Sequence, residues 1–62
     1  MDRLTVVVDY AYPCMMAEKA LRNLHNAMLR KDYDDALEQA LIAMAEAKLA
    51  YNAIRHEKEK AQ

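Results

Sequence analysis

The chain has 62 residues, a formal net charge of −1, a single cysteine and no glycine. A chain this short forms one domain (1–62) with a small core, so regular helix packing or self-association is expected to support it. Cys14 cannot form an intrachain disulfide, Cys14 with the distant His25 and His56 lacks the paired spacing of a zinc site, and a chain without glycine has no phosphate-binding glycine loop.

Residues 3–12 are predicted to form a short β-like strand, because valine and tyrosine favour extended backbone. Leu4, Val6, Val8 and Tyr10 alternate with Thr5, Val7 and Asp9. A single strand leaves its backbone donors and acceptors unpaired, so its expected mate is the same strand of a second copy, related by a two-fold axis. The alternative is an extended arm that lies across the helices.

A first helix is predicted over 13–31, because proline is favoured in the first helical turn and disfavours helix for the residue before it. Apolar residues then recur at steps of three and four, which places them on one helical face. These residues are Cys14, Ala17, Leu21, Leu24 and Met28.

A second helix is predicted over 33–58, with Asp32 as its cap and Asp34 and Asp35 in the first turn, where negative charge is favourable. The connection is only two or three residues long, so the helices should pack antiparallel. The face expected to meet the first helix carries seven residues at helical spacing. They are Tyr33, Leu37, Ala40, Met44, Ala47, Tyr51 and Ile54.

A second apolar stripe on this helix, formed by Leu41, Ala45 and Leu49, lies well round the cylinder from the first. A hairpin offers only one partner helix, so a doubly apolar helix needs a further surface. The sequence therefore predicts an all-α fold, an antiparallel helical hairpin with a short N-terminal strand that assembles as a dimeric four-helix bundle. The residues predicted for self-association are these three together with Val6 and Val8.

Catalytic, metal and cofactor sites are not expected, and the chain is not expected to be an enzyme. A nucleophile must lie beside its base, whereas Cys14 and His25 lie about 16 Å apart along one helix. No stretch approaches the roughly 18 apolar residues of a membrane span, and the N-terminus is acidic where a signal peptide is basic. Together with the unpaired cysteine, this predicts a cytoplasmic protein without a membrane partner.

The order strand–helix–helix, with Pro13 at the first helix start, resembles the ribbon-helix-helix family of dimeric repressors. The resemblance implies a two-stranded ribbon in the DNA major groove, with Thr5, Val7 and Asp9, or their neighbours Leu4, Val6 and Val8, at the base-reading positions. None of these side chains is basic, the family's glycine-containing turn is absent, and the second helix is too long. A DNA-binding transcriptional regulator is therefore the alternative function, and nucleic acid is not the expected partner.

The segment Glu46–Arg55 and the chain length are similar to small accessory proteins encoded by tailed phages, and 32–37 resembles the inter-helix turn of a tetratricopeptide repeat, without the repeat period. The expected function is a small oligomeric protein–protein interaction module, which a phage could use to modulate a host protein. The residues predicted to bind such a partner are Tyr10, Tyr12, Asp34 and Asp35, because exposed tyrosines supply contact area at low entropic cost.

Overall fold

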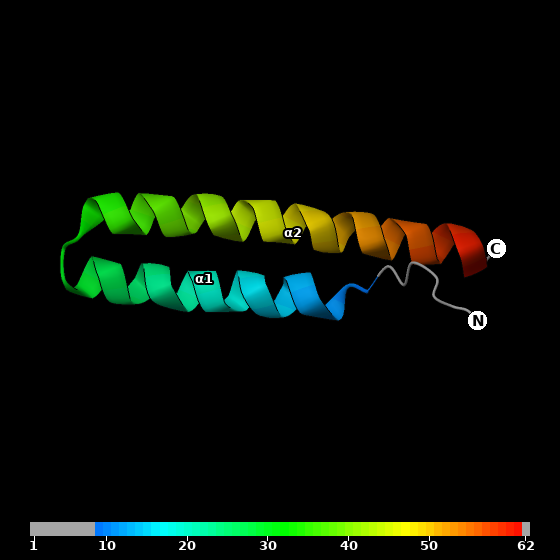
Figure 1. Ribbon diagram of the computed structural model, residues 1–62, viewed down its shortest axis with the longest axis horizontal. Coiled ribbons are helices and arrows are strands. Elements are labelled where there is room, and N and C mark those ends of the chain that lie inside the picture. Colours follow the sequence, from blue (N-terminus) through cyan, green and yellow to red (C-terminus); the bar gives the residue numbers. More distant parts are fainter. Residues whose placement is uncertain (1–8, 62) are drawn as a thin grey trace.

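The protein is an antiparallel pair of α-helices, α1 (Ala11–Leu29) and α2 (Tyr33–Ala61), joined by the three residues 30–32 (Figure 1). The computed structural model describes residues 9–61. Its extents of 47 × 22 × 13 Å are those of a single layer of two helices. The predicted helical hairpin is confirmed, and α2 extends beyond the N-terminal end of α1 (Figure 1).

The first helix begins two residues earlier than predicted, so Ala11 and Tyr12 are helical and not extended. The Asp9 carboxylate accepts a hydrogen bond from the Ala11 N–H at 2.9 Å, and the Tyr10 carbonyl accepts the first helical bond, from Cys14, at 3.0 Å. Pro13 fits this start because N–H groups in the first turn have no helical acceptor. Asp9 and Tyr10 do not form a strand either, and Tyr10 has the helical angles φ −75° and ψ −23°. The rest of the predicted strand, 3–8, lies outside the described residues.

The connection between the helices is a Schellman motif closed by a lysine. The Lys31 N–H donates to the Met28 carbonyl at 3.0 Å and the Asp32 N–H donates to the Ala27 carbonyl at 2.9 Å. This pattern requires the residue after the cap to be left-handed, and Lys31 has φ 60°. The first helix therefore ends at Leu29, two residues before the predicted boundary.

The second helix begins where it was predicted and ends later. An Asp32 carboxylate oxygen accepts a hydrogen bond from the Asp35 N–H at 3.2 Å, as expected of an N-cap residue. The charged C-terminal segment continues the helix to Ala61 and holds an Arg55–Glu59 ion pair at 3.5 Å, one helical turn apart. Such exposed pairs support helix ends modestly.

The seam between α1 and α2 is made of small residues, and this corrects the predicted packing. The buried residues of the described chain are Pro13, Ala20, Ala27, Ala36, Ala43 and Ala53. Most of them are separated by seven residues, or two helical turns, which keeps them along one line of each helix. Because alanine is short, the two backbones can approach closely and the bulky neighbouring side chains project to either side of the seam.

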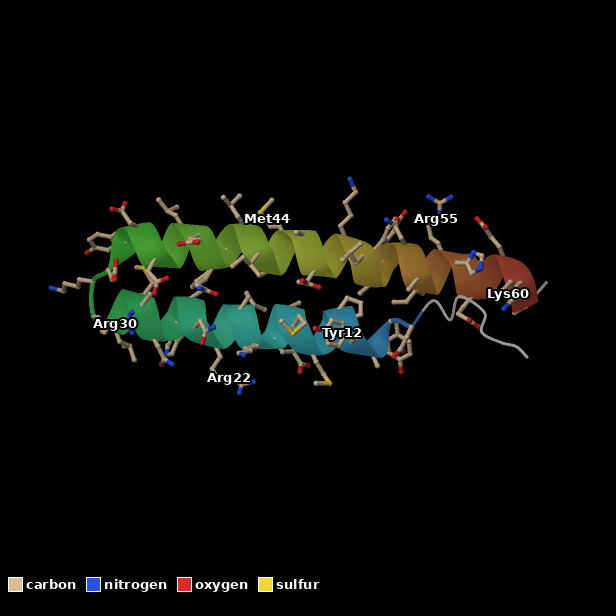
Figure 2. The ribbon with its side chains drawn as sticks, viewed as in Figure 1. Tyr12, Arg22, Arg30, Met44, Arg55 and Lys60 are labelled. Carbon is tan, nitrogen blue, oxygen red and sulfur yellow. The ribbon has the colours of Figure 1, made fainter. Side chains whose placement is uncertain are left out.

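The two bulky stripes that were expected to face each other across the hairpin are therefore not its core. Leu21 is 54% exposed, and Leu37 and Met44 are each 66% exposed. Figure 2 shows that Met44, in the middle of α2, does not point toward α1. The expectation that the largest apolar side chains fill the interior is wrong for a single hairpin.

Candidate functional site

Bulky apolar side chains are concentrated on the surface of this hairpin. Within residues 9–61 no leucine, isoleucine, methionine or tyrosine is buried, and only Met16 and Leu24 are half-buried. Folded chains ordinarily bury most residues of these types. Large exposed apolar surfaces are typical of sites that bind another protein, a membrane or a ligand.

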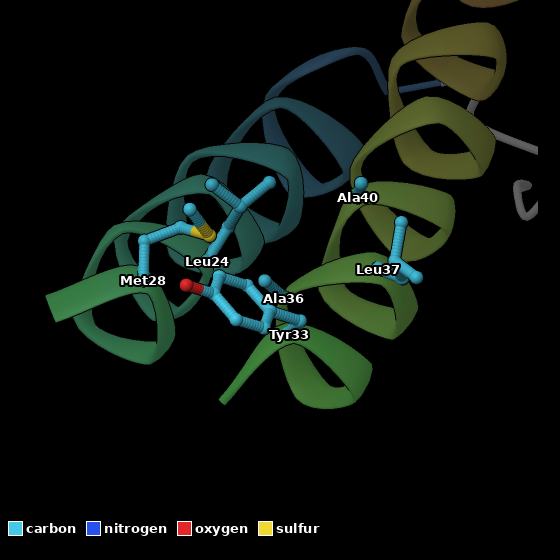
Figure 3. Close-up of a pocket in the computed structure, with 6 residues that line it drawn as sticks. All are labelled: Leu24, Met28, Tyr33, Ala36, Leu37 and Ala40. Atoms are coloured by element: carbon cyan, nitrogen blue, oxygen red, sulfur yellow. The ribbon is translucent and has the colours of Figure 1, made fainter. Parts of the chain in front are cut away.

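The bulky stripes of the two helices lie on the same side of the hairpin. Leu24 follows the seam residue Ala20 by four positions, and Ala40 follows the seam residue Ala36 by four. Equal rotations from the seam bring residues of two antiparallel helices to the same face of the pair. Figure 3 confirms this, since Leu24 of α1 lines one depression with Ala40 of α2.

We call this surface the apolar face. Its α1 part consists of Cys14, Ala17, Leu21, Leu24 and Met28, and its α2 part consists of Tyr33, Leu37, Ala40, Met44, Ala47, Tyr51 and Ile54. Its depression near the connection is lined by Leu24, Met28, Tyr33, Ala36, Leu37 and Ala40, without a charged side chain (Figure 3).

The apolar face is large enough for a specific interface. From Tyr33 to Ile54 it extends about 30 Å, and two helices side by side are about 20 Å wide, which gives roughly 600 Å² in plan. A standard interface buries about 800 Å² of accessible surface per partner, and accessible surface exceeds the plan area. None of the twelve residues is charged, and the Arg55 guanidinium lies 5.9 Å from the centre of the Tyr51 ring.

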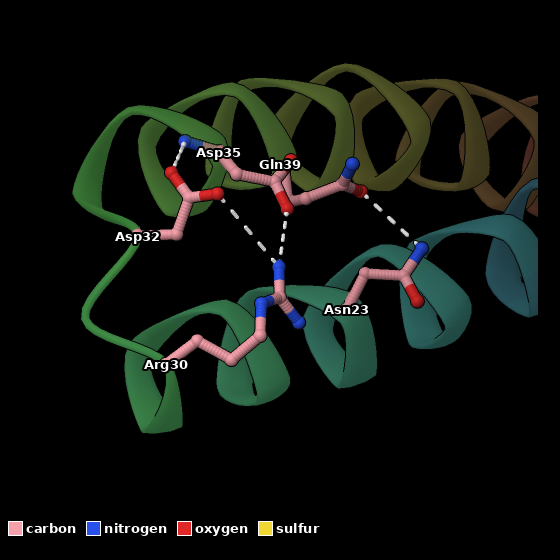
Figure 4. Close-up of polar contacts among 5 residues, drawn as sticks. All are labelled: Asn23, Arg30, Asp32, Asp35 and Gln39. Atoms are coloured by element: carbon pink, nitrogen blue, oxygen red, sulfur yellow. Dashed lines mark hydrogen bonds and ion pairs between the residues drawn. The ribbon is translucent and has the colours of Figure 1, made fainter.

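The opposite face of the hairpin is polar near the connection. The Asn23 amide donates to Gln39 across the seam at 3.5 Å, and the Arg30 guanidinium pairs with Asp35 at 3.1 Å and lies 3.9 Å from Asp32 (Figure 4). These contacts fix the register of the two helices. The hairpin is therefore amphipathic as a whole, with one apolar face and one mixed face.

The residues predicted for self-association lie elsewhere on the surface. Leu41, Ala45 and Leu49 are exposed, on the side of α2 turned away from the seam. Leu41 lies at the outer edge of the apolar face, whereas Leu49 lies toward the mixed face. Val6 and Val8 lie outside the described residues, so their part in self-association stays a prediction.

The four residues predicted to bind a partner are not brought together. Tyr10 and Tyr12 lie at the start of α1, whereas Asp34 and Asp35 lie at the start of α2, which is the other end of an antiparallel pair. The two groups are separated by roughly 25 Å along the helix axes. Asp35 is half-buried and paired with Arg30, so a partner would find it already engaged.

In the described part of the chain, side chains that could act in catalysis or bind a metal are not grouped together. Cys14 is a free, exposed thiol on the apolar face. Over the described range 9–61, no three histidine, cysteine, aspartate or glutamate side chains are grouped to hold a metal ion. Neither α1 nor α2, as far as these residues extend, has a window long and apolar enough to cross a membrane.

Fold and surface together define a class: a two-helix hairpin with an alanine seam and one uncharged apolar face. The chain matches no family model, no curated protein and no solved structure. Its function must therefore be inferred from the face itself.

Sequence reasoning found the residues of the apolar face but assigned them to the interior. This assignment could have been corrected from the regular placement of alanine, seven residues apart within each helix, at Ala20, Ala27, Ala36 and Ala43. Such spacing predicts a seam of closely approaching helices.

Proposed function

We propose that the chain is a protein–protein interaction module that works as a homodimer, in which two apolar faces pack together as a four-helix bundle. The observation that carries this proposal is that the described part of the chain buries no bulky apolar side chain. Apolar surface released from water is the main favourable contribution to folding and association, and a single hairpin leaves most of it in contact with solvent.

A second copy of the chain would cover the apolar face with a matching uncharged surface. The face contains no charge, so stacking two such faces buries no unpaired ion, the costliest defect of an interface. Four-helix bundles are built by this kind of packing, with short loops between antiparallel neighbours. The mixed faces, which carry Tyr12 on one helix and Ile42 on the other, stay on the outside of the dimer and are available to another protein.

Self-association tests the proposal. Sedimentation equilibrium at about 100 μM, about 100 times a micromolar Kd, is expected to give close to twice the chain mass for the natural protein and the chain mass for the variant Leu37→Glu, Met44→Glu. Both substituted side chains belong to the apolar face, and an unpaired carboxylate buried there is strongly unfavourable.

The matched control places the same charges on the other side of α2, in the variant Ile42→Glu, Leu49→Glu. This variant is expected to keep the dimer mass. The proposal fails if the natural chain is a folded monomer, or if the control variant dissociates while the Leu37→Glu, Met44→Glu variant remains dimeric. Circular dichroism on each sample separates loss of association from loss of helix.

A further inference from the structure

We infer that the partner of the apolar face is a second copy related by a two-fold axis that crosses the helices at the level of Leu21 and Ile42, so that the two connections lie at opposite ends of the bundle. This inference rests on the proposed function and specifies its geometry. In this arrangement α1 lies on the partner's α1 and α2 on the partner's α2, each pair antiparallel.

The first argument is the order of large and small residues along α2. Between its two tyrosines the face reads Tyr33, Leu37, Ala40, Met44, Ala47, Tyr51, and Ile54 lies beyond this symmetric part. Reversal about position 42 leaves the spacing unchanged and places Leu37 opposite the partner's Ala47 and Ala40 opposite the partner's Met44. The tyrosines at the two ends face each other. A large residue thus meets a small one, as close packing of two layers requires.

The second argument is the same symmetry in α1. Reversal about Leu21 places Cys14 level with the partner's Met28, and Ala17 within one residue of the partner's Leu24. Leu21 itself meets the partner's Leu21 on the axis. Away from the axis, small residues again face large ones.

The third argument is that the two centres coincide in the folded hairpin. The Asn23–Gln39 hydrogen bond sets the register, and a depression on the mixed face is lined by both Ala20 and Ile42. Leu21, which follows Ala20, therefore lies within one residue, or about 1.5 Å, of the level of Ile42. A single axis can satisfy both helices only if the two centres share a level, and the fold places them there.

The fourth argument is charge at the edges of the face. On α2, reversal about Ile42 places the exposed Asp34 level with the partner's Ala50, which is two residues, or about 3 Å, from the exposed Lys48. On α1, reversal about Leu21 places the exposed Glu18 within one residue of the partner's exposed His25. The α2 edge is therefore complementary in charge to the same edge of the partner, which favours this register.

Distances between spin labels test the geometry directly. In a Cys14→Ala background that sedimentation shows to be dimeric, labels at Lys31→Cys and at Lys58→Cys are attached in separate samples. The rise of about 1.5 Å per residue from position 42 gives expected label-to-label distances of about 35 Å for the Lys31→Cys sample and about 50 Å for the Lys58→Cys sample. A bundle with both connections at one end would give less than about 25 Å at both sites, and that result overturns the inference.

Charge exchange gives a second test that is independent of labels. Asp34→Lys is expected to weaken the dimer by about two- to five-fold, the scale of an exposed ion pair, because it meets the partner's Lys48. Adding Lys48→Asp restores the affinity, since both ends of the pair are then exchanged. Glu38→Lys, an exposed position of α2 that points away from the apolar face, is the control and leaves the affinity unchanged.

If the doubly exchanged chain binds no better than the Asp34→Lys chain, the inferred register is overturned. A dimer with short distances at both labelled sites rejects the two-fold axis and leaves the proposed function in place. A natural chain that is folded and monomeric at 100 μM, a concentration chosen as about 100 times a micromolar Kd, rejects both.

Discussion

A single residue, Lys31, closes the hairpin in a conformation that glycine would adopt more easily. Its φ of 60° places Cβ close to a neighbouring carbonyl, a cost of roughly 1–2 kcal/mol for a residue with a side chain. The chain has no glycine at all, so the connection is held by its two Schellman hydrogen bonds and by Arg30 bound to Asp35. These contacts thus maintain Lys31 in its left-handed conformation despite the conformational cost.

Lys31→Gly is expected to raise the free energy of unfolding by about 1 kcal/mol, because it removes the left-handed penalty and leaves the backbone hydrogen bonds intact. Urea denaturation monitored by circular dichroism at fixed chain concentration measures the change. The control is Lys19→Gly, an exposed position inside α1, which is expected to lower the free energy of unfolding by about 1 kcal/mol. A loss of stability in Lys31→Gly would contradict this account of the turn.

At the scale of the elements, the sequence predicted both helices, the capping role of Asp32 and the antiparallel connection, since these depend on local chemistry. It did not predict which stripe of α2 meets α1. Ala36 and Leu37 are adjacent, and each belongs to a stripe of helical period. Periodicity alone therefore does not decide which of the two stripes lies in the seam. The rule that large apolar residues lie inside presumes that one chain contains its whole core, and here the smaller stripe occupies the seam.

The start of α1 was also misplaced for a local reason. Pro13 suits any position of the first turn, and the sequence reading placed it first, whereas the Asp9 side chain and the Tyr10 carbonyl begin the helix two residues earlier. Tyr12 lies within this helix although tyrosine generally favours β-strands. The apolar face was predicted residue by residue, but its role as a surface could be recognised only from the folded pair.

Ala43→Leu tests the seam. Ala43 is buried between the helices, so three added carbons force them apart, with an expected loss of about 1–3 kcal/mol in the free energy of unfolding. Ala45→Leu, two residues away and exposed, adds the same atoms at a position turned away from the seam and is expected to change stability by less than about 0.5 kcal/mol. Equal effects of the two substitutions would show that the seam is not where the helices meet.

At the scale of the whole molecule, the hairpin is a single layer 13 Å thick, so both of its faces stay in contact with solvent unless a second layer covers one of them. If the second copy completes the core, folding and association are linked, and the stability of the fold depends on chain concentration. The midpoint of thermal unfolding is therefore expected to rise by several degrees for each hundred-fold increase in concentration. A midpoint that is independent of concentration between 1 and 100 μM, the range around a micromolar Kd, would contradict this linkage.

Cys14 gives this linkage a chemical reporter, because its free thiol lies on the apolar face and is exposed in the single hairpin. Pairing would shield the sulfur, so alkylation by iodoacetamide would slow as the chain becomes more concentrated, and a labelled chain would be hindered from pairing. The natural protein would thus record its own state of assembly in the rate at which one sulfur atom is consumed.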